Sequence, residues 1–332
     1  MLFSNLYIND LVETRVLNKI IKIFILPLLA QLNLLISPAL ATDFTFASKE
    51  KAIEILTADD EYLSNMQPIE IALRVGSPTA DKTIEDLKIH FTENVSEWPA
   101  AEKAQIKALL VTHKKKLEKI FHLLPDTVYF VKVTDKVEGD IPHTRENAFI
   151  SPKRITSYST SLFFHQLFHI LSREQRVKRA LLYDIIEFKP CYFQTTELID
   201  KYSFKDPETP LSAFYLPVEI DGRDTAVISY LHTTKEGFDP SIEGGLNGHV
   251  SGDLMEVSVN DGVCTPVNGN DGKPNILKHE LIPDFYDKVG RNVKYVIHPE
   301  EIMAGNFALL MKNKKGLPDP DIPEDLEEWL ER

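Results

Sequence analysis

Cysteine is scarce in this chain of 332 residues, which contains only Cys191 and Cys264. The sequence has no C-x-x-C pair, so it predicts neither a thioredoxin-like redox motif nor a zinc ribbon. In an exported protein the two cysteines can form a disulfide, which would contribute about 4 kcal/mol in the chain-entropy model. Two separate buried thiols fit the same sequence, because sequence spacing does not give the distance between them.

Positive charge is also in deficit. The formal net charge is -13, from 37 Lys and Arg against 50 Asp and Glu. This charge argues against nucleic acid as a partner and against binding to anionic lipid. The chain lacks a G-x-S-x-G nucleophile motif, a Walker loop and a dinucleotide-binding fingerprint, which argues against the enzyme classes that those motifs mark.

Residues 1–41 have the pattern of a secretory signal peptide. Lys19 and Lys22 precede an apolar run that ends in Ala39-Leu40-Ala41, a typical cleavage site. Four residues make the run a poor membrane span, namely Pro27, Gln31, Asn33 and Pro38. We therefore predict export to the periplasm or the medium, with a mature protein that begins near Thr42 and is not stably inserted in a membrane. The alternative is an N-terminal helix packed on the core.

The rest of the chain predicts one domain over residues 42–315 and an acidic tail over 316–332. Apolar residues at helical spacing over 96–123 precede a strand-like run over 126–134. Clusters of Gly, Asn, Asp and Pro divide residues 188–280 into short strand-like runs, which predicts a β-rich insertion. The proline-broken tail predicts a loose arm with a short docked helix at Trp329.

Residues 161–171 are the stretch around which the domain is organised. His165 and His169 are four residues apart, so they lie on the same face of a helix. The neighbouring residues are apolar nearly all round, which predicts a buried helix. A buried pair of imidazoles needs partners, and one metal ion satisfies both. The alternative is two structural histidines that are hydrogen-bonded in the core.

The stretch resembles the H-E-x-x-H helix of zinc metallopeptidases, in which the two His bind zinc and the Glu is the general base. This sequence departs from the motif at Gln166, which stands at the position of the Glu. An amide can hydrogen-bond a water molecule but cannot take its proton. The resemblance therefore implies the metal site of a metallopeptidase more directly than it implies the activity.

Zinc sites use at least three protein ligands, and the best candidate for the third lies near residue 300. Residues 301–308 resemble the E-x-x-A and F-A pattern of the gluzincin class, in which a Glu on a later helix completes the site. The resemblance makes Glu301 the ligand, with Glu300 as the rival one residue away. Gly305 stands where thermolysin-like members have an Asp that orients a ligand His.

Two further histidines are weaker candidates for the site. His298 precedes Pro299 and is predicted to cap the helix or lie outside it, although it could share a metal with Glu301. His143 precedes a predicted short strand and could face the cleft. A strand beside the metal-binding helix is how such enzymes hold an extended peptide.

These observations predict an α+β fold, with zincin-like helices packed on a small, mostly antiparallel sheet and one zinc ion. The first functional hypothesis is an exported zinc-metallopeptidase homologue, inactive or weakly active, that binds a peptide or protein in the former active-site cleft. The second is an active metallopeptidase that uses another base, such as a displaced Glu. The third is a metal-free secreted binding domain.

Overall fold

The structure, a computed structural model, describes residues 42–210 and 213–332, so the predicted signal peptide lies outside the described residues. Residues from Thr42 to Arg332 form one unit of mixed helices and strands. No helix in these two ranges is long and apolar enough to span a bilayer. The elements before residue 160 are β1 (Asp43–Phe46), α2 (Lys49–Thr57), α3 (Glu61–Ser64), α4 (Pro68–Val75), α5 (Ile84–Glu93), β2 (Val95–Ser96), α6 (Ala100–Thr112), α7 (Lys114–Ile120), β3 (Thr127–Val133), β4 (His143–Arg145) and β5 (Ala148–Pro152).

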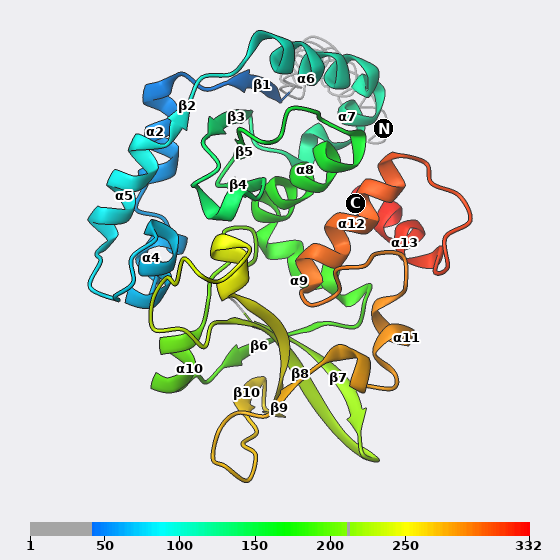
Figure 1. Cartoon of the computed structure of the whole chain (residues 1–332). Coiled ribbons are helices and arrows are strands. Elements are labelled where there is room, and N and C mark those ends of the chain that lie inside the picture. The colour runs from blue at the N-terminus through cyan, green and yellow to red at the C-terminus, as the bar shows by residue number, and fades with distance from the viewer. Residues whose placement is uncertain (1–41, 211–212) are drawn as a thin grey trace, which may run out of the picture. The chain divides into compact units, whose positions relative to one another are not determined.

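The second half of the chain begins with the predicted histidine helix (Figure 1). Its elements are α8 (Thr160–Glu174), α9 (Arg179–Asp184), β6 (Lys189–Phe193), α10 (Glu197–Tyr202), β7 (Ala213–Ile220), β8 (Arg223–His232), β9 (Ser251–Asn260), β10 (Val263–Pro266), β11 (Ile276–Leu277), α11 (Phe285–Val289), α12 (Pro299–Met311) and α13 (Asp321–Leu330).

The first sheet has the strand order β1-β3-β5-β4, with β2 also paired to β3. β3 runs parallel to β1 and β5, whereas β2 and β4 pair antiparallel to their neighbours. The prediction of a mostly antiparallel sheet is therefore wrong for this sheet. Between β1 and β3 the chain forms α2 to α7 and the short strand β2, and a long, mainly helical connection of this kind allows two neighbouring strands of a sheet to be parallel.

Helices cover both faces of this sheet. Side chains alternate along β3, so that Val128 and Phe130 face one core while Val131 and Val133 face another. The first core contains the apolar residues of α8, and the second contains those of α2, α3 and α5. The buried helix predicted from the apolar run around the histidines is thus confirmed, because α8 packs between the sheet and α12 (Figure 1).

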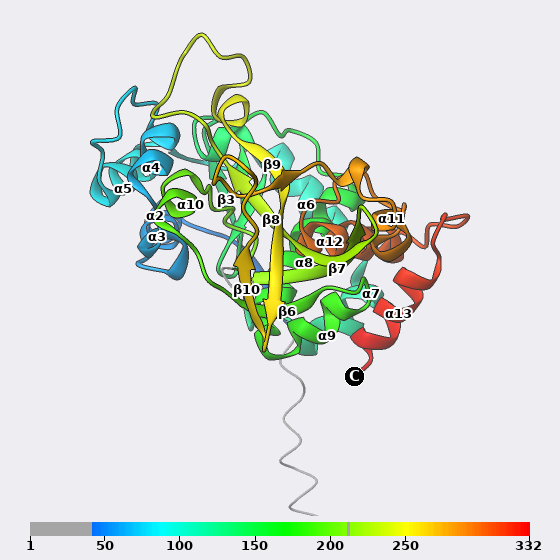
Figure 2. The same ribbon diagram turned by 90° about the horizontal axis from the view of Figure 1, so that it is seen from below.

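The second sheet is built between Lys189 and Leu277, and it curls into a small barrel. Its order is β10-β6-β7-β8-β9-β11, and β10 also pairs with β9, so that five strands close on themselves. Figure 2 shows β6, β7, β8, β9 and β10 grouped together, with α10 at their side. One hydrophobic cluster joins the barrel strands to Ile199 of α10, and its other buried members are Ala226, Ile228, Met255, Val257 and Cys264.

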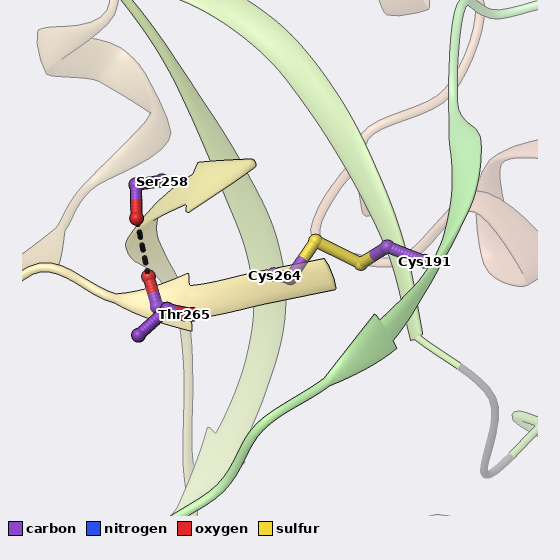
Figure 3. The surroundings of a disulfide bond; sticks show 4 residues. All are labelled: Cys191, Ser258, Cys264 and Thr265. Carbon is purple, nitrogen blue, oxygen red and sulfur yellow. Dashed lines mark hydrogen bonds between the residues drawn. A yellow bond between two sulfur atoms is a disulfide. The ribbon is translucent and has the colours of Figure 1, made fainter. Parts of the chain in front are cut away.

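A disulfide between Cys191 on β6 and Cys264 on β10 joins two neighbouring strands of the barrel (Figure 3). The Cα atoms of the two cysteines are 5.9 Å apart, within the usual range for a disulfide. The same figure shows the Ser258 hydroxyl donating to the Thr265 carbonyl oxygen at 3.4 Å, across the β9–β10 pair. The alternative of two separate thiols is therefore wrong for this structure.

The acidic tail forms more structure than a loose arm. α13 packs on α12 and buries its apolar face, which consists of Ile322, Pro323, Leu326, Trp329 and Leu330. α12 in turn packs on α8, where the Phe307 ring lies 6.0 Å from Phe164 and 5.5 Å from Phe168 between centroids. The two predicted ligand helices are therefore in direct contact, and α13 supports the second from behind.

Candidate metal centre

The first two site residues are placed by α8. The Ser159 hydroxyl caps the helix by accepting a hydrogen bond from the Leu162 amide at 3.1 Å. One turn and a half further on, His165 and His169 project from the same face, with ring centroids 4.8 Å apart. His169 is completely buried, whereas the His165 side chain keeps 28% of its surface exposed. The site therefore opens to solvent at His165.

The third site residue comes from α12, which begins at Pro299 as predicted. His298 caps this helix, since its Nδ1 accepts a hydrogen bond from the Glu300 amide at 3.1 Å. Glu301 then reaches both histidines of α8, with Oε2 3.2 Å from His165 Nε2 and Oε1 3.6 Å from His169 Nε2. One ligand atom from each of the three residues lies within 4.8 Å of the others, so this group can hold a metal ion.

Glu300, the rival ligand, holds His169 from behind. Its carboxylate accepts a hydrogen bond from His169 Nδ1 at 2.9 Å and another from the Ser172 hydroxyl at 2.7 Å. The Tyr183 hydroxyl donates to the same carboxylate. The contact with Nδ1 places the histidine proton there and leaves Nε2 as a lone pair that faces Glu301. A carboxylate in this position orients a metal-binding histidine and makes it a stronger ligand.

The unpartnered nitrogen of His169 is the observation that tests the fit of a metal. His169 Nε2 is buried and has no hydrogen-bond partner among the described residues. Two carboxylate oxygens lie near it, Glu301 Oε1 and Glu208 Oε2, each 3.6 Å away. Lone pairs facing one another in a buried site repel, and a cation between them turns the repulsion into attraction. Ligands of a tetrahedral zinc lie about 3.3–3.6 Å apart, and the distances from Glu301 to His165 and His169, 3.2 Å and 3.6 Å, are close to that spacing, so these three residues fit the ion.

Burial and neighbouring charges shift the pKa values of the carboxyl groups in the cluster. Burial alone would raise the pKa of Glu301, but the adjacent His169 and His165 lower it to about 2. Burial and the nearby charge of Glu301 raise the pKa of Asp206 to about 7. The same two causes raise the pKa of Glu208 well above its usual value. Several acidic groups thus lie close together in one small buried space, which favours the binding of a cation there.

Glu208 is the site residue that the sequence did not reveal. It lies in the connection between α10 and β7, and only 7% of its side chain is exposed. The Gln166 amide is oriented by its neighbours: with the nitrogen facing Glu208, it donates to Glu208 Oε1 at 2.9 Å and to the His143 carbonyl at 3.3 Å. The Glu208 carboxylate therefore contacts Gln166 through one oxygen and faces His169 with the other.

The two weaker histidine candidates lie outside the group of ligands. His143 on β4 is buried, its Nδ1 is 3.0 Å from the Ile141 carbonyl oxygen, and burial lowers the pKa of its ring to about 4. His298 is occupied as the cap of α12, and burial lowers its pKa to about 4 as well. Only the main chain of His143 approaches the centre, through its contact with Gln166.

Gly305 has no room for the carboxylate that the resemblance implies at its position. A Cβ atom added there would lie 2.4 Å from Val293 Cγ1. Glu300 supplies a carboxylate to His169 instead, from the first turn of the same helix. The carboxylate that orients the histidine thus comes from position 300, whereas the resemblance places it at position 305.

Comparison of the chain with protein families, with characterised proteins and with solved structures finds no match. The site is therefore interpreted from its own geometry and chemistry.

Proposed function

We propose that the protein binds one zinc ion through His165, His169 and Glu301, and that it acts on peptides as an exported, weakly active metallopeptidase homologue. The observation that carries the proposal is the buried, unpartnered His169 Nε2, which faces two carboxylates and is oriented by a third. Nitrogen and carboxylate oxygen at this spacing are the ligands that zinc prefers.

The arrangement of elements supports a zincin-like interpretation. α8 packs on a mixed sheet whose edge strand β4 is antiparallel to its neighbour, and α12 carries the third ligand against α8. Gln166 links α8 to the edge strand β4, because its amide contacts the His143 carbonyl beside the candidate metal centre. An extended peptide can bind along such an edge by main-chain hydrogen bonds, which would bring its scissile bond to the metal.

The chemistry follows from the groups that surround the site. Bound zinc lowers the pKa of water and polarises a carbonyl group. Glu300 keeps His169 in the orientation and protonation state that binding needs.

A second candidate function, peptide binding without hydrolysis, is favoured by one observation. Gln166 occupies the position at which the resemblance requires a general base, and an amide cannot accept a proton from water. In that case the centre would hold a peptide group in place and release it unchanged.

The disulfide supports the proposal that the protein is exported. Disulfides persist in oxidising compartments such as the bacterial periplasm and the extracellular medium, and are rare in reducing ones. Cys191 and Cys264 are joined within the β-rich part of the chain. Mass spectrometry of the mature protein tests both points, since an intact disulfide and an N-terminus near Thr42 are expected.

The decisive experiment combines metal content with peptide cleavage. Protein purified without chelator is expected to contain zinc, and a mixture of unstructured peptides is expected to be cleaved slowly and only when the zinc is present. Zinc without cleavage would favour the binding function. Absence of zinc that cannot be corrected by loading would contradict both functions and leave the metal-free binding domain.

A further inference from the structure

A carboxylate reaches the metal centre from outside the two ligand helices. Glu208 lies in the irregular segment that follows α10, and its Oε2 is 3.6 Å from His169 Nε2. Its Oε1 accepts a hydrogen bond from Gln166 at 2.9 Å. We propose that Glu208 is the general base of this site and replaces the carboxylate that α8 lacks at position 166. This inference rests on the proposed metallopeptidase function.

The position of Glu208 is fixed by contacts of its own amide and of the residue before it. Its amide donates to Asp206 Oδ1 at 2.8 Å, which closes a tight turn. Arg173, at the end of α8, donates to the Pro207 carbonyl at 3.1 Å. The turn is thus attached to the same helix that carries His165 and His169. A base must be held in a defined place to act, and these contacts hold Glu208 beside the ligands.

A second set of contacts ties the start of this connection to α4. The Lys205 amide donates to Glu70 Oε1 at 2.6 Å, and the Lys205 ammonium is 3.0 Å from Glu70 Oε2. Arg74 donates to the Lys205 carbonyl oxygen at 2.6 Å. Glu70 and Arg74 are both almost completely buried, so these charged hydrogen bonds are protected from water. Residues 205–208 are therefore held at their first residue and at their turn.

The amide at position 166 fits a base at position 208. A carboxylate at 166 would lie 2.9 Å from the carboxylate of Glu208, where two like charges cannot both be ionised. An amide instead donates a hydrogen bond to Glu208 and leaves its second oxygen free to face the metal centre. Gln166 is then a positioning residue. Glu208 takes the role of general base that the Glu has in the H-E-x-x-H motif.

The chemical step can be written with this chain's own groups. Glu208 accepts a proton from a water molecule while the water oxygen bonds to the carbonyl carbon of the peptide. The bond between this carbon and the peptide nitrogen then breaks, and Glu208 passes the proton to the departing amine. The hydroxyl of the water ends on the acyl carbon and its proton on the nitrogen, so that no further reactant is needed.

The test compares Glu208→Gln with wild type in the full mature protein, with the exposed Glu219→Gln on β7 as the matched control. We expect chelator-sensitive peptide cleavage to fall by about 10²–10⁴-fold in Glu208→Gln and to stay unchanged in the control. Zinc affinity, measured by competition with a chelator, is expected to change less than about tenfold, because a base is not a ligand.

A readout independent of turnover uses cobalt in place of zinc. The absorption spectrum of the cobalt protein should be the same in wild type and in Glu208→Gln. Acetohydroxamate, which presents acidic protons to a nearby carboxylate, should bind the variant about 10–100-fold more weakly. A changed cobalt spectrum together with a loss of zinc affinity beyond about 100-fold would overturn the inference and make Glu208 a fourth ligand.

The exchanged variant Gln166→Glu/Glu208→Gln guards against a trivial loss of folding in the single variant. It returns the carboxylate to α8 and should cleave faster than Glu208→Gln. If wild type cleaves with zinc and Glu208→Gln cleaves equally fast, the inference fails while the proposed function stands. If wild type binds zinc and cleaves nothing, hydrolysis itself fails and the inference with it.

Discussion

Two carboxylates face the unpartnered nitrogen of His169 at the same distance, yet they come from different kinds of structure. Glu301 belongs to α12, which is fixed by apolar packing on α8 and by α13 behind it. Glu208 belongs to an irregular connection that is fixed by charged hydrogen bonds to Arg74, Glu70 and Arg173. The proposed ligand is therefore held by apolar packing, whereas the proposed base is held by a polar network.

This difference separates the two tasks of the site. Apolar packing keeps its strength over a wide range of pH and salt, and it suits a group that must hold an ion permanently. A polar network can be altered at single residues without unfolding the helices, and connections of this kind often carry reactive groups on a rigid frame. Changes to the helix pair should therefore affect metal binding, and changes elsewhere should leave it intact.

The largest effect is expected from His169→Ala. The substitution removes one of the three proposed ligands, so the loss of zinc affinity should exceed the roughly 10–100-fold that removal of an outer partner costs. His143→Ala is the control, because His143 is also buried but lies outside the ligand group. Zinc content after gel filtration and competition with a chelator give the measurement. Stoichiometric zinc in His169→Ala would contradict the site.

The next effect tests the barrel. Cys191→Ser/Cys264→Ser opens a bridge between residues 73 apart, which should lower the free energy of unfolding by about 4 kcal/mol in the chain-entropy model. Zinc affinity should stay the same at temperatures where the variant is folded, because the ligands stand on α8 and α12. Urea unfolding of the variant, of wild type and of reduced wild type provides the comparison. Lost zinc in the folded variant would show that barrel and helix pair are not independent.

Glu300→Gln sharpens the comparison within the helix pair. An amide can no longer accept all three hydrogen bonds of the buried carboxylate, so His169 loses its fixed orientation. Zinc affinity should fall by about 10–100-fold. Glu256→Gln, which changes an equally buried Glu of the barrel, is the matched control and should leave the affinity unchanged. If Glu300→Gln and Glu256→Gln bind zinc with equal affinity, Glu300 does not orient His169.

Gly305→Ala tests how closely α12 is packed. The added methyl group would lie 2.4 Å from Val293 Cγ1, and overpacking of this kind costs about 1–3 kcal/mol of stability. The double variant Gly305→Ala/Val293→Ala should recover part of the loss, because it returns the space. Thermal unfolding of the three proteins measures the effect. A single variant as stable as wild type would show that α12 can shift without cost.

The smallest effect concerns acid. Burial alone would raise the pKa of Glu138, but Arg74 and His143 nearby and hydrogen bonds from Tyr62 and Arg74 lower it below the usual 4.5. Glu138 therefore adds stability above about pH 4.5, and this contribution is lost as the pH falls through the lowered pKa. Glu138→Gln should show a shallower fall of unfolding free energy between pH 5 and pH 3 than wild type, as measured by urea unfolding at each pH.

The sequence predicted the parts of the site that depend on local signals. α8 and α12 are marked by apolar spacing, by Ser159 before the first helix and by Pro299 at the start of the second. The spacing of His165 and His169 by four residues places them on one face wherever a helix forms. These signals lie within one or two turns of chain, so a single sequence contains them.

The remaining parts depend on contacts between distant segments. Glu208 lies in a run of turn residues, Lys205 to Pro210, and only its anchoring by Arg173 and Arg74 brings it to the metal centre. The roles of Glu300 and Glu301 depend on which one faces α8, and this is set by packing rather than by spacing. The parallel pairing of β3 with its neighbours depends on where the chain returns after a long helical crossover.

The docking of α13 has a practical consequence for anyone who produces this protein. Trp329 and Leu330 are buried against the rest of the domain. An affinity tag fused directly after Leu330 would begin where these apolar side chains are inserted, and a truncation before α13 would expose the side of α12 that α13 covers. Either change would weaken the packing that supports α12, the helix that carries Glu300 and Glu301. A low zinc content in such a preparation would then result from the tag or the truncation.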